Sequence, residues 1–123
     1  MSEIRATTIS DAAGTGPIAL TKQSAAKAWV NLTQIGTQSI QDSFNTSSIT
    51  DNNVGRTTPT WASAMSNSTY AASFAAWDDA YWLNVSCGSS KTPSGYLYAA
   101  VRTGTSTKED CDEVHLLAHG DLA

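Results

Sequence analysis

Two aspartates stand side by side in an aromatic stretch, Trp77-Asp78-Asp79-Ala80-Tyr81-Trp82. Paired carboxylates flanked by aromatic rings resemble the sites that cleave glycosidic bonds. Neighbouring residues of a strand point to opposite faces, however, so Asp78 and Asp79 can straddle one bond only in a special turn. We therefore predict no catalytic residues and no enzyme, and polysaccharide cleavage is the weakest function considered.

His115 and His119 lie four residues apart, a spacing that places two metal ligands on one face of a helix. Val114, Leu116 and Ala118 alternate with these residues, which is the period of a strand. On a strand the two histidines lie on one face about 13 Å apart, too far to share an ion. We expect them on a solvent or subunit face and predict no metal site within one chain. The alternative is a trimer axis that gathers three copies of one histidine into a ring for an anion or metal.

The remaining chemical patterns are weak. Glu109, Asp110, Asp112 and Glu113 form an acidic patch without the spacing of a calcium loop. No Gly-x-Ser-x-Gly elbow and no Gly-rich phosphate motif is present, and no cofactor is predicted. Cys87 and Cys111 are too few for a disulfide framework or a metal site. A reducing cytosol favours free thiols, and the alternative is one disulfide formed after release from the cell.

Aromatic side chains are the best candidates for a binding site, because tryptophan and tyrosine stack on sugar rings and anchor protein contacts. The candidates for contact with a glycan or receptor are Trp77, Tyr81, Trp82, Tyr96 and Tyr98. A structural role for the same residues is the alternative, with Tyr96 and Tyr98 packed against a neighbouring chain. Candidates for a subunit interface are Trp29, Trp61, His115 and His119, and the two tryptophans are also candidates for the core.

The composition favours strands and disfavours several partners. The chain has 123 residues, a length typical of a single domain, and only 15% of them are charged. Abundant serine and threonine weaken helices, and aliphatic residues are sparse, so we expect burial between subunits to supplement the core. A net charge of −4 argues against phosphate contacts, so nucleic acid is an unlikely partner. No apolar run is long enough for a membrane span and no secretion signal is present, which predicts a soluble chain made in the cytoplasm.

Alternating apolar and polar residues predict an all-β domain, an antiparallel β-sandwich or a jelly-roll-like body. The expected strands fall within residues 18–33, 38–44, 47–50, 57–61, 70–85, 96–103 and 113–118. Residues 18–33 are expected to form one long strand or a broken pair, and the alanines of residues 70–85 also permit a helix as the alternative. Asp51-Asn52-Asn53-Val54-Gly55 is a strong hairpin signal between the third and fourth of the expected strands.

Three local features refine this prediction. The alternation places Ile40, Asp42 and Phe44 on one side of their strand. Pro59 cannot donate a ladder hydrogen bond, so it predicts an edge or a bulge. Residues 1–17 hold little to bury and are predicted to form an extended arm or a strand that pairs with a partner, ahead of a β-domain at residues 18–123.

Several short segments of the sequence resemble those of a family of short bacteriophage structural proteins of the tail-fibre type. They are Lys27-Ala28-Trp29-Val30-Asn31, Asp42-Ser43-Phe44-Asn45 and Ser47-Ser48-Ile49-Thr50-Asp51-Asn52. The resemblance extends back to Ile4 and fades after Ala76. Pro59 and Trp61 depart from the family's pattern of alternating valine, phenylalanine and threonine.

The resemblance implies a homotrimer on the exterior of a virion, made in the host cytoplasm. It implies a tail fibre or related appendage that helps to attach the particle to a bacterial surface polysaccharide or protein. Residues 1–17 are then expected to hold other virion proteins. The alternative is a capsid decoration or head-fibre protein whose arm lies on the shell.

Overall fold

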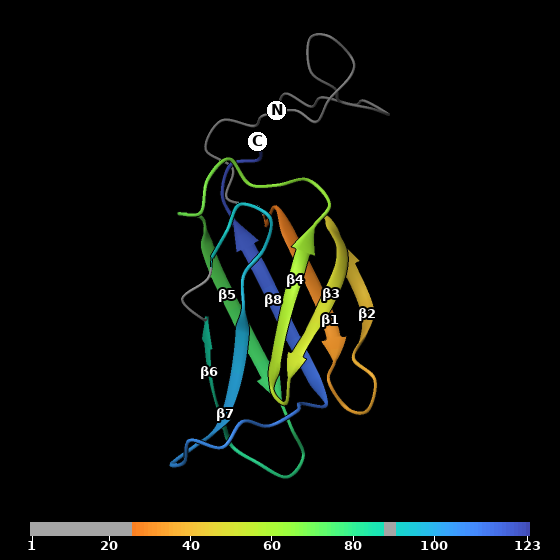
Figure 1. The fold of residues 1–123 in the computed structure, drawn as a ribbon, viewed down its shortest axis with the longest axis vertical. Helices are drawn as coiled ribbons and strands as arrows, with labels where there is room; N and C mark the ends of the chain where they lie inside the picture. The colour runs from red at the N-terminus through yellow and green to blue at the C-terminus, as the bar shows by residue number, and fades with distance from the viewer. Residues whose placement is uncertain (1–25, 88–90) are drawn as a thin grey trace, which may run out of the picture.

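The computed structural model describes residues 26–87 and 91–123, and these residues form two layers of antiparallel sheet (Figure 1). Eight strands lie in the described residues: β1 (Ala28–Thr33), β2 (Ser39–Phe44), β3 (Thr46–Asn53), β4 (Arg56–Trp61), β5 (Ala71–Trp77), β6 (Leu83–Cys87), β7 (Tyr98–Arg102) and β8 (Glu113–His119). The predicted all-β class is confirmed. The predicted arm, residues 1–17, lies outside the described residues, as does the beginning of the predicted strand at 18–33.

Each sheet has four strands. The first sheet has the order β2-β1-β8-β5 and the second has the order β3-β4-β7-β6. The β1–β2, β3–β4 and β6–β7 connections stay within one sheet, and the other four cross from one sheet to the other. Of the two predicted forms, the antiparallel sandwich is the one that the strands build.

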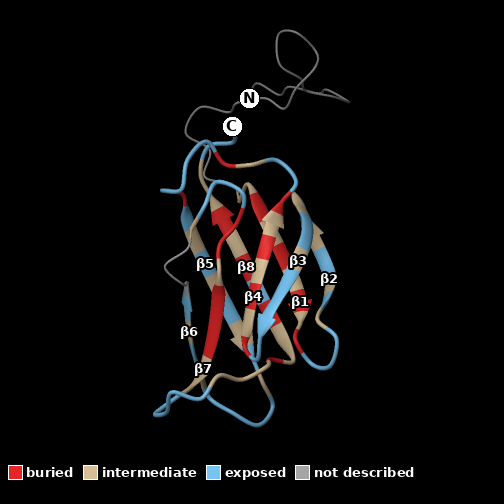
Figure 2. Cartoon of the chain, viewed as in Figure 1, coloured by how far each residue is buried: buried red, intermediate tan, exposed pale blue. Residues whose placement is uncertain are grey.

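The core lies between the sheets and follows from the alternation of each strand. In β1 and β8 every second residue is buried, with Val30 and Leu32 facing Leu116 and Val114 across the strand pair. Figure 2 shows that the buried residues concentrate on the inner strands β1, β8, β4 and β7, whereas β2 and β3 at the edges are mainly exposed.

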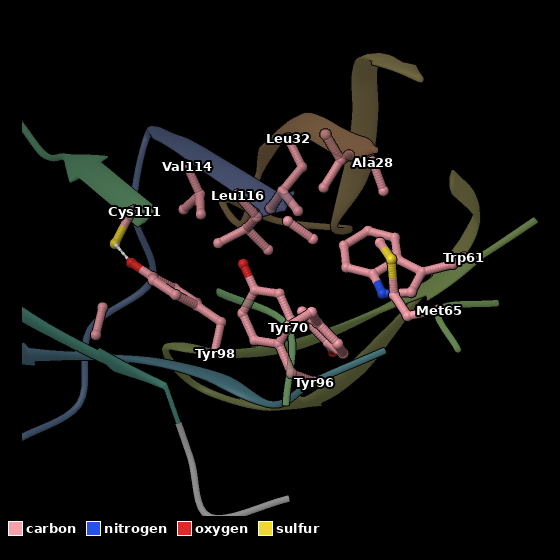
Figure 3. Packing of buried hydrophobic residues seen from close by; sticks show 13 residues of the cluster. Ala28, Leu32, Trp61, Met65, Tyr70, Tyr96, Tyr98, Cys111, Val114 and Leu116 are labelled. Carbon is pink, nitrogen blue, oxygen red and sulfur yellow. Dashed lines mark hydrogen bonds between the residues drawn. The ribbon is translucent and has the colours of Figure 1, made fainter. Parts of the chain in front are cut away.

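Aromatic rings fill much of this core and compensate for the shortage of aliphatic side chains. Tyr96 lies near the rings of Trp61 and Tyr70, with centroids 5.8 Å and 6.3 Å away (Figure 3). Phe74 meets Tyr98 edge to face at 6.1 Å. Such tilted pairs are the favoured geometry of aromatic rings. One chain therefore has a core of its own, and the trimer remains a prediction.

The strand predicted at residues 38–44 is present as β2, but the face predicted for Ile40 is wrong, because the strand contains a bulge. Asn31 pairs with Asp42 but Leu32 pairs with Ile40, so Gln41 is an extra residue. One inserted residue reverses the faces of everything beyond it. Ile40 consequently points toward the core, whereas Phe44 lies on the outer face and is 55% exposed.

The predicted hairpin at residues 51–55 is confirmed, and β3 pairs with β4 on either side of it. Asn53 and Gly55 both have positive φ there. Pro59 does not place β4 at an edge, because β4 lies between β3 and β7. Its ladder with β7 contains only Arg56 and Thr57, however, so the proline falls where no hydrogen bond to that neighbour is required.

Candidate functional site

Three exposed aromatic residues lie in or beside the β5–β6 loop, at one end of the sandwich, which is at the bottom of Figure 1. Trp77 ends β5, and Tyr81 and Trp82 lie in the loop that leads to β6. Trp82 is 89% exposed, Trp77 57% and Tyr81 41%. Three of the five predicted contact residues are thus brought together on one surface.

Two shallow depressions flank this loop. One, of about 370 Å³, is lined by Ala76, Trp77, Asp78, Asp79, Ala80, Tyr81, Trp82 and Leu83. The other, of about 400 Å³, is lined by Ala80, Tyr81, Trp82, Arg102, Thr103 and Thr105. Since residues 80–82 line both, they form a crest between the two depressions.

Hydrogen bonds hold the crest in place. Asp78 Oδ1 accepts bonds from the amides of Ala80 and Tyr81, both at 2.9 Å. At the other end of the loop, the Thr103 amide donates to the Trp82 carbonyl at 2.8 Å. The Asp79 amide donates to Asp112 Oδ2 at 3.0 Å, which ties the loop to the β7–β8 connection.

Arg102 supports the crest from the end of β7. It lies on the same face of the strand as Tyr98, and its pairing with Leu83 brings it to the loop. The guanidinium carbon is 3.6 Å from the centroid of the Tyr81 ring, a cation–π contact. Its Nε donates to Glu109 Oε2, and this hydrogen bond raises the pKa of Arg102 above its ordinary value. The ring of Tyr81 is therefore fixed by a charge-paired side chain.

The sequence did not indicate Arg102, Thr103 and Thr105 as site residues. Their place depends on the pairing of β6 with β7 and on the course of the loop after Arg102. No local sequence motif carries this information, so only the pairing of β6 with β7 could have identified these residues.

Two of the predicted contact residues are wrong. Tyr96 and Tyr98 are completely buried between the sheets and cannot contact a glycan or a neighbouring chain. Tyr96, Tyr98 and Ala100 do share one face of the chain at and just before β7, but this face points into the core. Tyr98 instead places its hydroxyl 3.9 Å from Cys111 Sγ (Figure 3).

Cys111 carries a free thiol that is fully buried, as the sequence favoured. Burial raises its pKa from the ordinary 9.0 to about 11, the Tyr98 contact opposes this, and the charge of Asp78 adds to it. Burial likewise raises the pKa of Tyr98. The Cys111 backbone is joined to Gln34, whose carbonyl oxygen Oε1 accepts from the Cys111 amide at 3.1 Å and whose Nε2 donates to Thr57 Oγ1 at 2.9 Å.

The interface candidates divide between the core and one surface. Trp61 is 4% exposed and belongs to the core. Trp29, His115 and His119 lie on the outer face of the first sheet, and the strand alternation predicted for the two histidines is confirmed. Cross-strand pairing there aligns Phe44, Trp29 and Leu117 in an apolar row. Beside this row, Glu113 Oε1 accepts from Asn31 Nδ2 at 3.0 Å and lies 3.2 Å from His115 Nε2.

Among residues 26–87 and 91–123 no group of three or more His, Cys, Asp or Glu side chains is arranged to hold a metal ion. That part of the chain also contains no helix long and apolar enough to cross a membrane.

Comparison with known proteins finds no family model, no curated protein and no solved structure that matches this chain. The resemblance to phage structural proteins therefore stays a prediction. The fold and the site define a β-sandwich domain with a fixed, exposed aromatic end.

Proposed function

We propose that this chain is a non-enzymatic structural protein on the exterior of a bacteriophage particle, a tail fibre or related appendage. It helps to attach the particle to a bacterial surface polysaccharide or protein through Trp77, Tyr81 and Trp82. The family resemblance supports the first part of this proposal, and the aromatic end of the sandwich supports the second.

The observation that carries the proposal is the exposure of Trp82 on an ordered loop. A tryptophan that is 89% exposed contributes almost nothing to the stability of the fold, because an aromatic side chain stabilises a protein mainly when it is buried. Four backbone amides anchor this loop through the hydrogen bonds described above. A loop whose backbone is already ordered loses little backbone entropy when it binds, which lowers the free-energy cost of using Trp82 as a binding anchor.

Weak sites of this kind require repetition. We propose a homotrimer that packs through the outer face of the first sheet, where Phe44, Trp29 and Leu117 form the apolar row. Several sugar sites on one particle then act together, because each bound site raises the effective concentration of the next.

Binding to intact cells tests the attachment function. Fluorescently labelled protein is added to a panel of bacterial strains, and retention on washed cells is measured. We expect retention on some strains only. Periodate treatment of the cells, which destroys sugar diols, abolishes it if the receptor is a polysaccharide, and protease treatment abolishes it if the receptor is a protein. Absence of retention on every strain would contradict the proposal.

A second candidate is a capsid decoration or head-fibre protein, and the apolar row on the first sheet favours it because shell proteins need such lateral contacts. The copy number of the chain in purified virions separates the candidates, being low for a fibre and high for a decoration protein. A depolymerase is a weaker candidate, since Asp78 and Asp79 line a depression. It predicts new reducing ends when the protein is incubated with host capsule.

A further inference from the structure

We propose that the crest at residues 80–82 divides a carbohydrate site into two subsites. A neutral oligosaccharide of two or more sugar units lies across Trp82, with one unit in each depression. This inference rests on the proposed attachment function and adds the class, the charge and the minimum length of the ligand.

The position of Trp82 is the first argument. Trp82 lines both depressions and is 89% exposed, so a sugar in either depression can reach the indole. At about 370 and 400 Å³, each depression lies at the lower end of the volumes of small-molecule sites, which are roughly 300–1,000 Å³. A single sugar ring placed in one depression would leave the other empty. A chain that crosses the crest uses both.

The polar groups of the two depressions are the second argument. The first contains the carboxylates of Asp78 and Asp79, which accept hydrogen bonds from sugar hydroxyls. Asp78 uses Oδ1 for the loop amides, and none of the described residues donates to the exposed Asp79 carboxylate. The second depression contains Arg102 instead, which can only donate, and Thr103, whose hydroxyl can donate or accept. The site therefore offers acceptors on one side and donors on the other, as a hydroxyl-rich chain with a direction requires.

The charges are the third argument. Two carboxylates line the first depression, and Asp112 is bonded to the Asp79 amide. In the second depression the charge of Arg102 is paired with Glu109. An acidic sugar would meet like charge on one side and a neutralised cation on the other. A neutral sugar is not repelled by the carboxylates, so the site selects neutral sugars over uronic acids.

Calorimetric titration with defined sugars tests the inference. The probes are mono-, di-, tri- and tetrasaccharides of glucose, galactose and mannose, together with uronic acid oligomers of equal length. We expect at least one neutral series to bind, with affinity that rises about tenfold or more from the monosaccharide to the disaccharide, which corresponds to about 1.4 kcal/mol. Trp82→Ala should abolish binding, and Asp79→Asn should weaken it about tenfold by removing a charged acceptor.

Ile35→Ala is the control, because Ile35 is 52% exposed and lines neither depression. It should leave the affinity unchanged. Equal affinity for mono- and disaccharides, tighter binding of uronic acids, or no binding of any neutral series would each overturn the inference. If cells still retain the wild-type protein in any of these cases, the attachment function survives and only its proposed ligand is wrong. If no cells retain it, the attachment function fails as well.

Discussion

At the scale of single residues, the same type of side chain has opposite roles in this molecule. Trp61 is buried against Tyr96 and stabilises the sandwich, whereas Trp82 lies almost entirely in solvent at its end. The sequence suggested that Trp82 was a contact residue, and the structure gives it no part in the core. The sequence alone could not distinguish the exposed aromatic residues from Tyr96 and Tyr98. Alternation shows which residues share a face of a strand, but not whether that face points into the core or into solvent.

Gly55 is a position where the fold requires glycine. Its φ is +64°, and a Cβ would lie 2.6 Å from the Glu109 carbonyl oxygen and 2.8 Å from that of Ala100. We expect Gly55→Ala to lower the free energy of unfolding by more than about 2 kcal/mol, because backbone atoms cannot yield as a flexible side chain does.

Gly36→Ala is the matched control, since Gly36 has a φ of +70° with no atom within 4 Å of the Cβ position. It should cost about 1 kcal/mol, the price of the left-handed conformation alone. Urea denaturation of both variants measures the difference. Equal losses would show that the close approach of the β7–β8 connection to Gly55 does not matter.

Cys111 gives the stability a dependence on alkaline pH. The thiol has a pKa of about 11 in the folded state against an ordinary 9.0, so above pH 9 the unfolded chain ionises it and the folded chain does not. The stabilisation is complete below pH 9 and declines as the pH rises toward 11, by about 1 kcal/mol at pH 10. Tyr98, whose pKa is also raised, adds a decline in the same direction.

Urea denaturation at pH 7 and pH 10 measures this decline, and Cys111→Ala should make it smaller. The buried thiol should also resist iodoacetamide at pH 8 in the folded protein, with peptide mapping to separate it from Cys87. An unchanged decline in Cys111→Ala, or rapid labelling of Cys111, would show that the thiol is not held protonated by burial.

At the scale of elements, what the sequence predicted depended on local information. The hairpin at residues 51–55 was predictable because its turn chemistry is contiguous, and β8 because its alternation is uninterrupted. The face of Phe44 was not, since the extra residue Gln41 shows only when β2 is paired with β1. Arg102 was missed for the same reason, as its contact with Tyr81 depends on the partner strand.

The loop of residues 78–82 is expected to be ordered by Asp78. Asp78→Ala removes the acceptor for the amides of Ala80 and Tyr81, so their hydrogen exchange should accelerate and ligand binding should weaken about tenfold. Asp51→Ala is the control, because Asp51 Oδ1 accepts from the Asn53 amide in the β3–β4 hairpin, outside both depressions. Slow exchange at Ala80 in the Asp78 variant would mean that other contacts order the loop.

At the scale of the whole molecule, the first sheet has an apolar row on its outer face. The row runs across three strands, from Phe44, which is 55% exposed, through Trp29 to Leu117. We expect sedimentation equilibrium to give a trimer, and Phe44→Ser combined with Leu117→Ser to give a monomer that remains folded. A wild-type monomer, or a double variant that remains trimeric, would exclude this face as the interface.

Retention of the labelled protein on bacterial cells, compared between Trp82→Ala and Ile35→Ala, tests the central claim most directly. Both substitutions remove exposed apolar side chains, and only Trp82 lines the two depressions. We predict that Trp82→Ala loses retention on every strain that binds the wild-type chain while Ile35→Ala keeps it. Equal retention by the two variants would contradict a role for the aromatic end in attachment.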